Sequence, residues 1–229
     1  METGIRIIDT LETIMRYIEQ DSHEEIHYEE EKNDEEEIYK ILLMIWKLSD
    51  DQTNRAVIIK KIDCFFCNFI IEKNQNIRDA SLGIIINIIS DPDAICYLLN
   101  HHLSKVKQIM TICKKTIHES NTLSYHVHLC SIFCRNACKN DFCTEYLAQR
   151  GIILTLSEKV ICFSHESQFT DTFISICCSI LQRNSCCLKV GINEIKIIHS
   201  LIQGAKMSKE WIRLSILVND ILQTTDHNL

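Results

Sequence analysis

The chain is poor in the residues that turn a polypeptide. It contains 1 proline and 5 glycines in 229 residues. All-β and α/β proteins need many tight turns, and glycine and proline supply a large share of them. Stacked helices need few such turns. The shortage therefore favours an all-α fold before any hydrophobic pattern is considered.

Several classes of function also lack their sequence signals. The first 20 residues are interrupted by Arg6, Asp9, Glu12 and Arg16, so we expect neither a signal peptide nor a membrane span. The formal net charge is -7, and no basic cluster favours contact with a phosphate backbone. Glycine-rich phosphate loops and the GxSxG and HExxH motifs are absent. We therefore expect no catalysis, no cofactor, no small-molecule substrate, and no nucleic-acid or membrane partner.

Cysteine, in contrast, is frequent, with 13 copies. The count is odd and no secretion signal accompanies it, which argues against a disulfide framework. Cys130, Cys134 and Cys138 recur at helical spacing among apolar residues, where a free thiol acts as a small hydrophobic side chain. We expect reduced cysteines and an intracellular location, in the nucleus or the cytoplasm.

A zinc- or thiol-dependent sensor is the alternative interpretation of the cysteines. His126 and His128 precede Cys130, but zinc needs ligands that converge tetrahedrally. The three cysteines instead follow one helical stripe, each about 6 Å above the last. Cys64 and Cys67 form a CxxC pair without the strand or helix start that redox motifs require. We therefore favour structural thiols and predict no metal site.

Three regions can be distinguished along the chain. Residues 1–20 place apolar side chains on one helical face, which predicts an N-terminal amphipathic helix. Residues 21–37 are dominated by Glu and Asp, and their mutual repulsion predicts an acidic linker or loop. Residues 38–229 show helix after helix, each too hydrophobic to stand alone. Such helices must be covered by their neighbours, which is the condition for a helical repeat domain.

A period appears when the ends of these helices are aligned. Asn87, Asn136 and Asn184 follow similar apolar stretches, and their spacings are 49 and 48 residues. Trp46 stands near the same register, 41 residues before Asn87. Steps of this length are typical of armadillo or HEAT units. We predict an all-α, armadillo/HEAT-like α-solenoid of about four short repeats.

The third copy resembles the armadillo consensus most closely. A long third helix is expected to end near Asn140 and Asp141, and Gly151 with Ile152 is expected to open the next unit. Glycine at such a position relieves backbone crowding where one repeat is followed by the next.

A more specific resemblance covers roughly the first 100 residues. The segments EEEIYKILLMIWKLSDD (35–51) and IRDASLGIIINIISDPDAICYLL (77–99) resemble the serum amyloid A-like, or synoviocyte-proliferation-associated, armadillo-type family. The resemblance implies a nuclear location, a link to cell-proliferation control and no defined catalytic activity.

Asn87, Asn136 and Asn184 are the candidate partner-binding residues. In armadillo proteins such asparagines line the concave groove, where an amide can both donate to and accept from an extended peptide backbone. The alternative is that each asparagine bonds the backbone of a neighbouring repeat. Trp46 is a further candidate, either packed between layers or exposed in the groove.

The sequence thus predicts a protein-interaction scaffold of armadillo type. A second interpretation is a subunit of a larger complex, docked through the C-terminal helix between Trp211 and Leu222. The thiol- or zinc-dependent sensor is the alternative from a different class.

Overall fold

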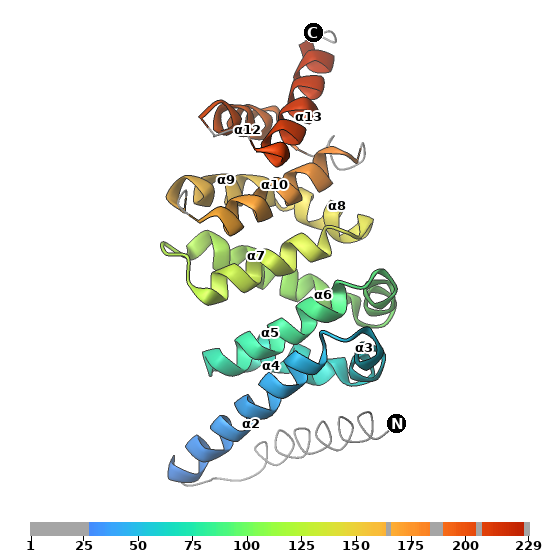
Figure 1. Cartoon of the computed structure of the whole chain (residues 1–229), viewed down its shortest axis with the longest axis vertical. Coiled ribbons are helices and arrows are strands. Elements are labelled where there is room, and N and C mark those ends of the chain that lie inside the picture. The colour runs from blue at the N-terminus through green and yellow to red at the C-terminus, as the bar shows by residue number, and fades with distance from the viewer. Residues whose placement is uncertain (1–27, 164–165, 184–189, 205–207, 227–229) are drawn as a thin grey trace. The chain divides into compact units, whose positions relative to one another are not determined.

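The computed structural model of the chain describes residues 28–163, 166–183, 190–204 and 208–226. Within these ranges the regular structure is entirely helical, as the composition predicted (Figure 1). The predicted amphipathic helix at residues 1–20 lies outside the described residues. The chain divides into two compact units, Met1–Ile109 and Met110–Leu229, where the sequence predicted one repeat domain. Each unit is described by itself.

The first unit is built around α5. In chain order its helices are α2 (Tyr28–Leu48), α3 (Gln52–Ile58), the 3-10 turn η1 (Ile59–Lys61), α4 (Ile62–Ile71), α5 (Gln75–Ile89) and the first part of α6 (Pro92–Glu119). Helix α5 packs against both α4 and α2. The core between them includes Leu42, Ile45, Phe65, Phe66, Phe69, Ile84, Ile85 and Ile88.

The acidic linker was predicted too long, because α2 begins at Tyr28 rather than after residue 37. Three physical effects explain the difference. Glu is a good helix former, and acidic residues near a helix N-terminus are stabilised by the helix dipole. Glu36 also pairs with Lys40 one turn later, with 2.7 Å between carboxylate and ammonium.

Most helix boundaries follow the polar breaks in the sequence. Asp51 caps α3 by accepting a hydrogen bond from the backbone N–H of Thr53 at 2.8 Å. Helix α6 begins at Pro92, whose fixed φ suits the first turn of a helix. Between α3 and α4 the chain passes through the 3-10 turn η1, so that α3 ends at Ile58 and α4 starts at Ile62.

Two features concern the apolar helices α5 and α6. No single described helix is long and apolar enough to cross a membrane, and α5 with α6 passes that test only as a pair bent by 114°. Helix α6 is itself interrupted at His102, whose φ of -132° and ψ of 29° are not helical. It therefore consists of two helical parts that meet at His102.

The second unit has two layers of helices. After the end of α6 come α7 (Tyr125–Ala137), α8 (Asp141–Gln149), α9 (Ile152–Cys162), α10 (Ser167–Leu181), α12 (Ile192–Gly204) and α13 (Lys209–Asp226). Helix α10 packs between α7 and α13, and α9 packs against α12. Phe169 and Phe173 of α10 are buried in the core, and Phe173 lies 6.2 Å from Trp211 of α13 between ring centroids.

The helices group in threes along the chain. One group is α3, α4 and α5, the next is the two parts of α6 with α7, and the third is α8, α9 and α10. Helices α12 and α13 then correspond to α9 and α10. The third helices of successive groups are accordingly α5, α7, α10 and α13, and α2 precedes them. This arrangement agrees with the predicted number of about four repeats.

Gly151 adopts the left-handed conformation, with φ of 68°, and it precedes α9. A glycine there avoids the clash that a Cβ would suffer at positive φ. Its place differs from the prediction, because α8 and α9 are the first and second helices of one group. Gly151 therefore forms a corner within a repeat, and the step between repeats falls instead at Asn140, which caps α8.

Candidate functional site

Asn87 lies near the end of α5 and is bound to the end of α2. Its amide nitrogen donates to Ser49 Oγ and to Asp50 Oδ1, both at 2.8 Å. The Trp46 carbonyl oxygen is 3.4 Å from the same nitrogen. Both amide hydrogens of Asn87 are thus directed at the end of α2. A partner could use the amide oxygen of Asn87 but would have to displace these bonds to reach the nitrogen.

Arg55 completes this connection, although no motif in the sequence singles it out. Its Nε donates to the Ser49 carbonyl at 2.7 Å and its Nη2 to the Asp50 carbonyl at 2.8 Å. Its Nη1 donates to Ser90 Oγ at 3.0 Å, at the end of α5. These carbonyls end a helix and have no partner within it, so the guanidinium satisfies groups that would otherwise need water. The hydrogen bonds of Arg55 therefore join the C-terminal ends of α2 and α5.

Trp46 is half-buried and lies against the backbone of α5 at Gly83. A Cβ built at Gly83 would overlap the Trp46 indole, since Cε2, Cζ2 and Cδ2 all lie too close to it for ordinary van der Waals contact. The tryptophan therefore fills the space between α2 and α5, and only part of its ring can meet a partner.

The other two candidate asparagines differ in position. Asn136 of α7 is 6% exposed, so its side chain offers a partner little surface. Asn184 lies outside the described residues. Next to it in the sequence, Arg183 donates to Asp141 Oδ1 and to the Ser179 carbonyl, each at 2.6 Å, and so connects the end of α10 to the start of α8.

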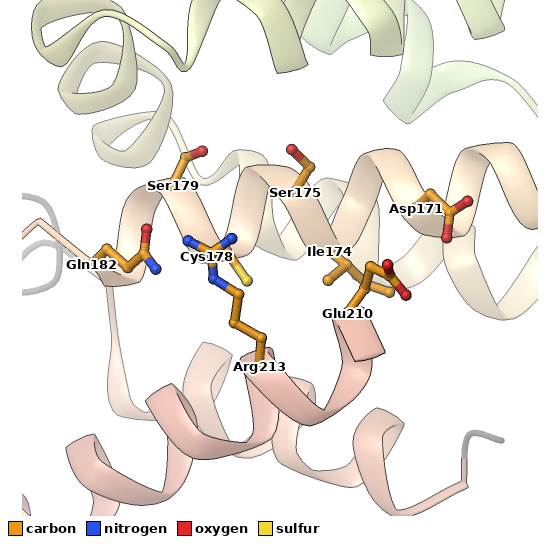
Figure 2. Close-up of a pocket in the computed structure, with 8 residues that line it drawn as sticks. All are labelled: Asp171, Ile174, Ser175, Cys178, Ser179, Gln182, Glu210 and Arg213. Carbon is orange, nitrogen blue, oxygen red and sulfur yellow. The ribbon is translucent and has the colours of Figure 1, made fainter. Parts of the chain in front are cut away.

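The second unit contains an open hollow between its third helices α10 and α13. Its volume is about 200 Å³, and Figure 2 shows Arg213 and Glu210 extending from α13 toward α10. The lining residues are Asp171, Ile174, Ser175, Cys178, Ser179, Gln182, Glu210 and Arg213. None of them was singled out from the sequence, because the two helices are far apart along the chain.

Charge is distributed unevenly in this hollow. Arg213 extends from α13 so that its guanidinium lies beside Cys178 and Gln182, whereas Glu210 extends toward Ile174 and the side of Asp171 (Figure 2). Burial raises the pKa of the Cys178 thiol, and the positive charge of Arg213 partly opposes that shift. Among the described residues Arg213 has no hydrogen-bond or ion-pair partner. The hollow thus has a cationic end and an anionic end.

The cysteines of the second unit are embedded in the core. Cys130, Cys134, Cys138 and Cys177 are fully or almost fully buried. Burial raises the pKa of Cys134 and of Cys177 well above the ordinary value, which keeps these thiols protonated and weakly nucleophilic. Within the described ranges, no three His, Cys, Asp or Glu side chains are grouped so that they could hold a metal ion.

Two solved structures have an architecture similar to that of this chain. An engineered protein solved by the Northeast Structural Genomics Consortium matches with a TM-score of 0.62 and 12% identity, over 80% of this chain and 73% of that one. A designed armadillo repeat protein matches with a TM-score of 0.60 and 11% identity, over 79% and 73%. The chain has an armadillo-type α-solenoid fold.

The comparisons show the fold of the chain and nothing more specific. No protein-family model matches the chain, and no curated protein sequence matches it either. The resemblance to the serum amyloid A-like family therefore rests on the two quoted segments alone.

Proposed function

We propose that the chain is a non-catalytic protein-interaction scaffold that holds an extended segment of a partner protein along its third helices. The observation that carries the proposal is the hollow between α10 and α13, where charged and amide groups reach solvent from two neighbouring helices. A fixed helical surface with such groups can bind the main chain of an extended segment through hydrogen bonds.

The exposed face of α10 has the polarity that this mode of binding needs. Asp171, Ser175, Ser179 and Gln182 follow one another at intervals of three or four residues, so they share one side of the helix. Carboxylate, hydroxyl and amide groups can each bond a peptide N–H or C=O, and the row offers both donors and acceptors.

Helix α7 packs against α10 as α13 does, and its half-buried His128 is one further polar group. Burial, followed by the charge of Arg135, lowers the pKa of His128, and Glu166 opposes the shift. The imidazole is therefore largely neutral near pH 7, where one ring nitrogen donates and the other accepts.

Asn87, Asn136, Asn184 and Trp46 remain candidate contacts for the partner segment in this proposal. For Asn87 the available group is the amide oxygen, because its nitrogen is engaged with the end of α2. We further propose a nuclear or cytoplasmic location and a role linked to cell-proliferation control, on the strength of the family resemblance.

Selection of random linear peptides against the full chain tests the proposal. Ser175→Tyr would place a large ring at the hollow. Ser200→Tyr is the control, because it makes the same change on the exposed face of α12, away from the hollow. We expect selected peptides to lose binding to the first variant and keep it for the second. Failure to select any peptide, or equal binding to both variants, would contradict the proposal.

A second candidate function is that of a subunit docked through α13. Ile212 is 46% exposed and Ile216 is 57% exposed, and they are one turn apart on the same helix face. A partner subunit, or a second copy of the chain, would bury them. Light scattering behind size exclusion over a range of concentrations, with Ile216→Glu as the variant, tests self-association: a concentration-dependent mass that the variant abolishes supports a second copy.

A further inference from the structure

The guanidinium of Arg213 lies at the edge of the α10–α13 hollow and has no hydrogen-bond or ion-pair partner among the described residues. Guanidinium groups in folded proteins usually find a carboxylate, a carbonyl or an aromatic face. Arg55, Arg150 and Arg183 do so here. Arg213 has no such partner among the described residues, although two carboxylates line the same hollow. Its fork of N–H donors is therefore available to a ligand.

We propose that the cationic end of this hollow is a subsite for a single carboxylate side chain, Asp or Glu, of the bound partner segment. This inference rests on the proposed function and specifies the chemistry of one position in the segment. Arg213 forms a paired hydrogen bond with the carboxylate, because its planar fork matches the two carboxylate oxygens. The Gln182 amide, on the facing helix, is placed to donate to the same group (Figure 2).

The surroundings of Arg213 strengthen such a pair. Ile174 and Cys178 are buried and form the apolar part of the lining. These apolar groups reduce the screening by solvent on one side of the pair, while Arg213 itself is exposed.

The size of the hollow limits what can enter. At about 200 Å³ it is smaller than the roughly 300–1,000 Å³ pockets that enclose whole small molecules. A single side chain of a longer segment fits such a space, and the rest of the segment can lie along α10.

The anionic end selects against other anions. Asp171 and Glu210 together outnumber the one cation, so a dianionic phosphate or a run of acidic residues would be repelled. A side-chain carboxylate carries one charge and can be held at the Arg213 end alone. The charge pattern therefore favours an isolated acidic residue.

Amide and arginine side-chain NMR signals of the full ¹⁵N-labelled chain provide the test. The probes are the capped peptides Gly-Gly-Glu-Gly-Gly and Gly-Gly-Gln-Gly-Gly, with inorganic phosphate as a third. We expect the Glu peptide to shift the signals of Arg213, Cys178 and Gln182 and to bind about tenfold more tightly than the Gln peptide. Phosphate should bind more weakly than the Glu peptide.

Variants assign the preference to Arg213. Arg213→Gln should abolish the difference between the two peptides. Lys196→Gln removes one positive charge from the exposed face of α12 and should leave the difference intact. The double variant Asp171→Asn/Glu210→Gln should reduce the difference in affinity between phosphate and the Glu peptide. An unchanged amide spectrum elsewhere shows that each variant is folded.

Three results would overturn the inference: equal affinity for both peptides, a preference that survives Arg213→Gln, or tighter binding of phosphate. If peptides selected from a random library still bind at the hollow in that case, the scaffold proposal stands and only the carboxylate subsite fails. If no selected peptide binds there, both fail.

Discussion

The indole of Trp46 lies directly on the backbone of α5 at Gly83, where no larger residue fits. This contact joins α2 to α5 in the first unit. It also explains why a glycine, normally unfavourable within a helix, occupies the middle of α5.

Replacement of Gly83 by alanine should therefore destabilise the first unit. In an open helix the same change stabilises by up to about 1 kcal/mol, but here the new methyl group displaces a ring, and overpacking costs about 1–3 kcal/mol. Urea unfolding followed by the helical circular dichroism signal, which does not depend on Trp46, would measure the loss.

Two further variants give this experiment its control. A Cβ at Gly204, the last residue of α12, meets no atom within 4 Å, so Gly204→Ala should be close to neutral. Combining Gly83→Ala with Trp46→Leu should recover part of the lost stability, because the smaller side chain leaves room for the methyl group. Equal effects of Gly83→Ala and Gly204→Ala would show that the contact is wrong.

Gly151 should resist substitution for a different reason, its positive φ. Nothing lies within 4 Å of a Cβ built there, so the cost of Gly151→Ala is conformational, about 1–2 kcal/mol. Gly191→Ala is the matched control, since its Cβ would be 3.6 Å from its nearest neighbour, Glu194 Oε2. Unfolding followed at Trp211, in the second unit, should show a lower midpoint for the first variant than for the second.

Two buried hydroxyl groups should respond in opposite directions. Ser81 Oγ is buried and has no hydrogen-bond partner among the described residues, so Ser81→Ala should be neutral or stabilise by up to about 1 kcal/mol. Thr144 Oγ1 contacts the carbonyls of Cys138 at 2.9 Å and Asn140 at 2.7 Å, so Thr144→Val should destabilise by about 1 kcal/mol. The denaturant midpoint of the unit that carries each substitution would measure its effect on stability. A clear loss of stability for Ser81→Ala would contradict the expectation.

Acid should weaken the first unit through Asp63. Burial alone would raise the pKa of this carboxyl, but its bonds to Lys105 at 2.7 Å and to His102 at 3.0 Å lower it below the ordinary 3.8. A depressed folded-state pKa gives stability above pH 3.8 that disappears as the pH falls through the folded value. Wild type should therefore exceed Asp63→Asn in stability at pH 6 and lose that advantage near pH 2. Parallel pH profiles of the two proteins would show that these bonds do not contribute.

The sequence predicted the fold class and many helix ends well, because both depend on local signals. Pro92 and Asp51 mark helix starts through effects that act within one turn. Tyr28–Glu37 was assigned wrongly, since repulsion between carboxylates was weighed without the favourable helix dipole. Gly151 was expected to relieve crowding between repeats, but a Cβ there meets no atom within 4 Å, and the need for glycine comes from its positive φ, at a corner whose place in the repeat depends on how α8 and α9 pack.

The site was much harder to predict than the fold. Asn87 was selected by its period alone, and the period does not reveal that Ser49 and Asp50 take up its amide hydrogens. Arg213 carries no motif, and its importance arises only where α13 meets α10 in space. Periodicity identifies which helices repeat, whereas the side chains exposed between two helices depend on tertiary contacts.

Paramagnetic relaxation in the full chain, with a nitroxide attached to a selected linear peptide, would show where a partner segment lies. We expect loss of signal concentrated at the α10–α13 hollow, at Ser175, Cys178, Gln182 and Arg213, and abolished by Ser175→Tyr. Signal loss confined to the outer face of α12, or spread evenly over the chain, would contradict this expectation.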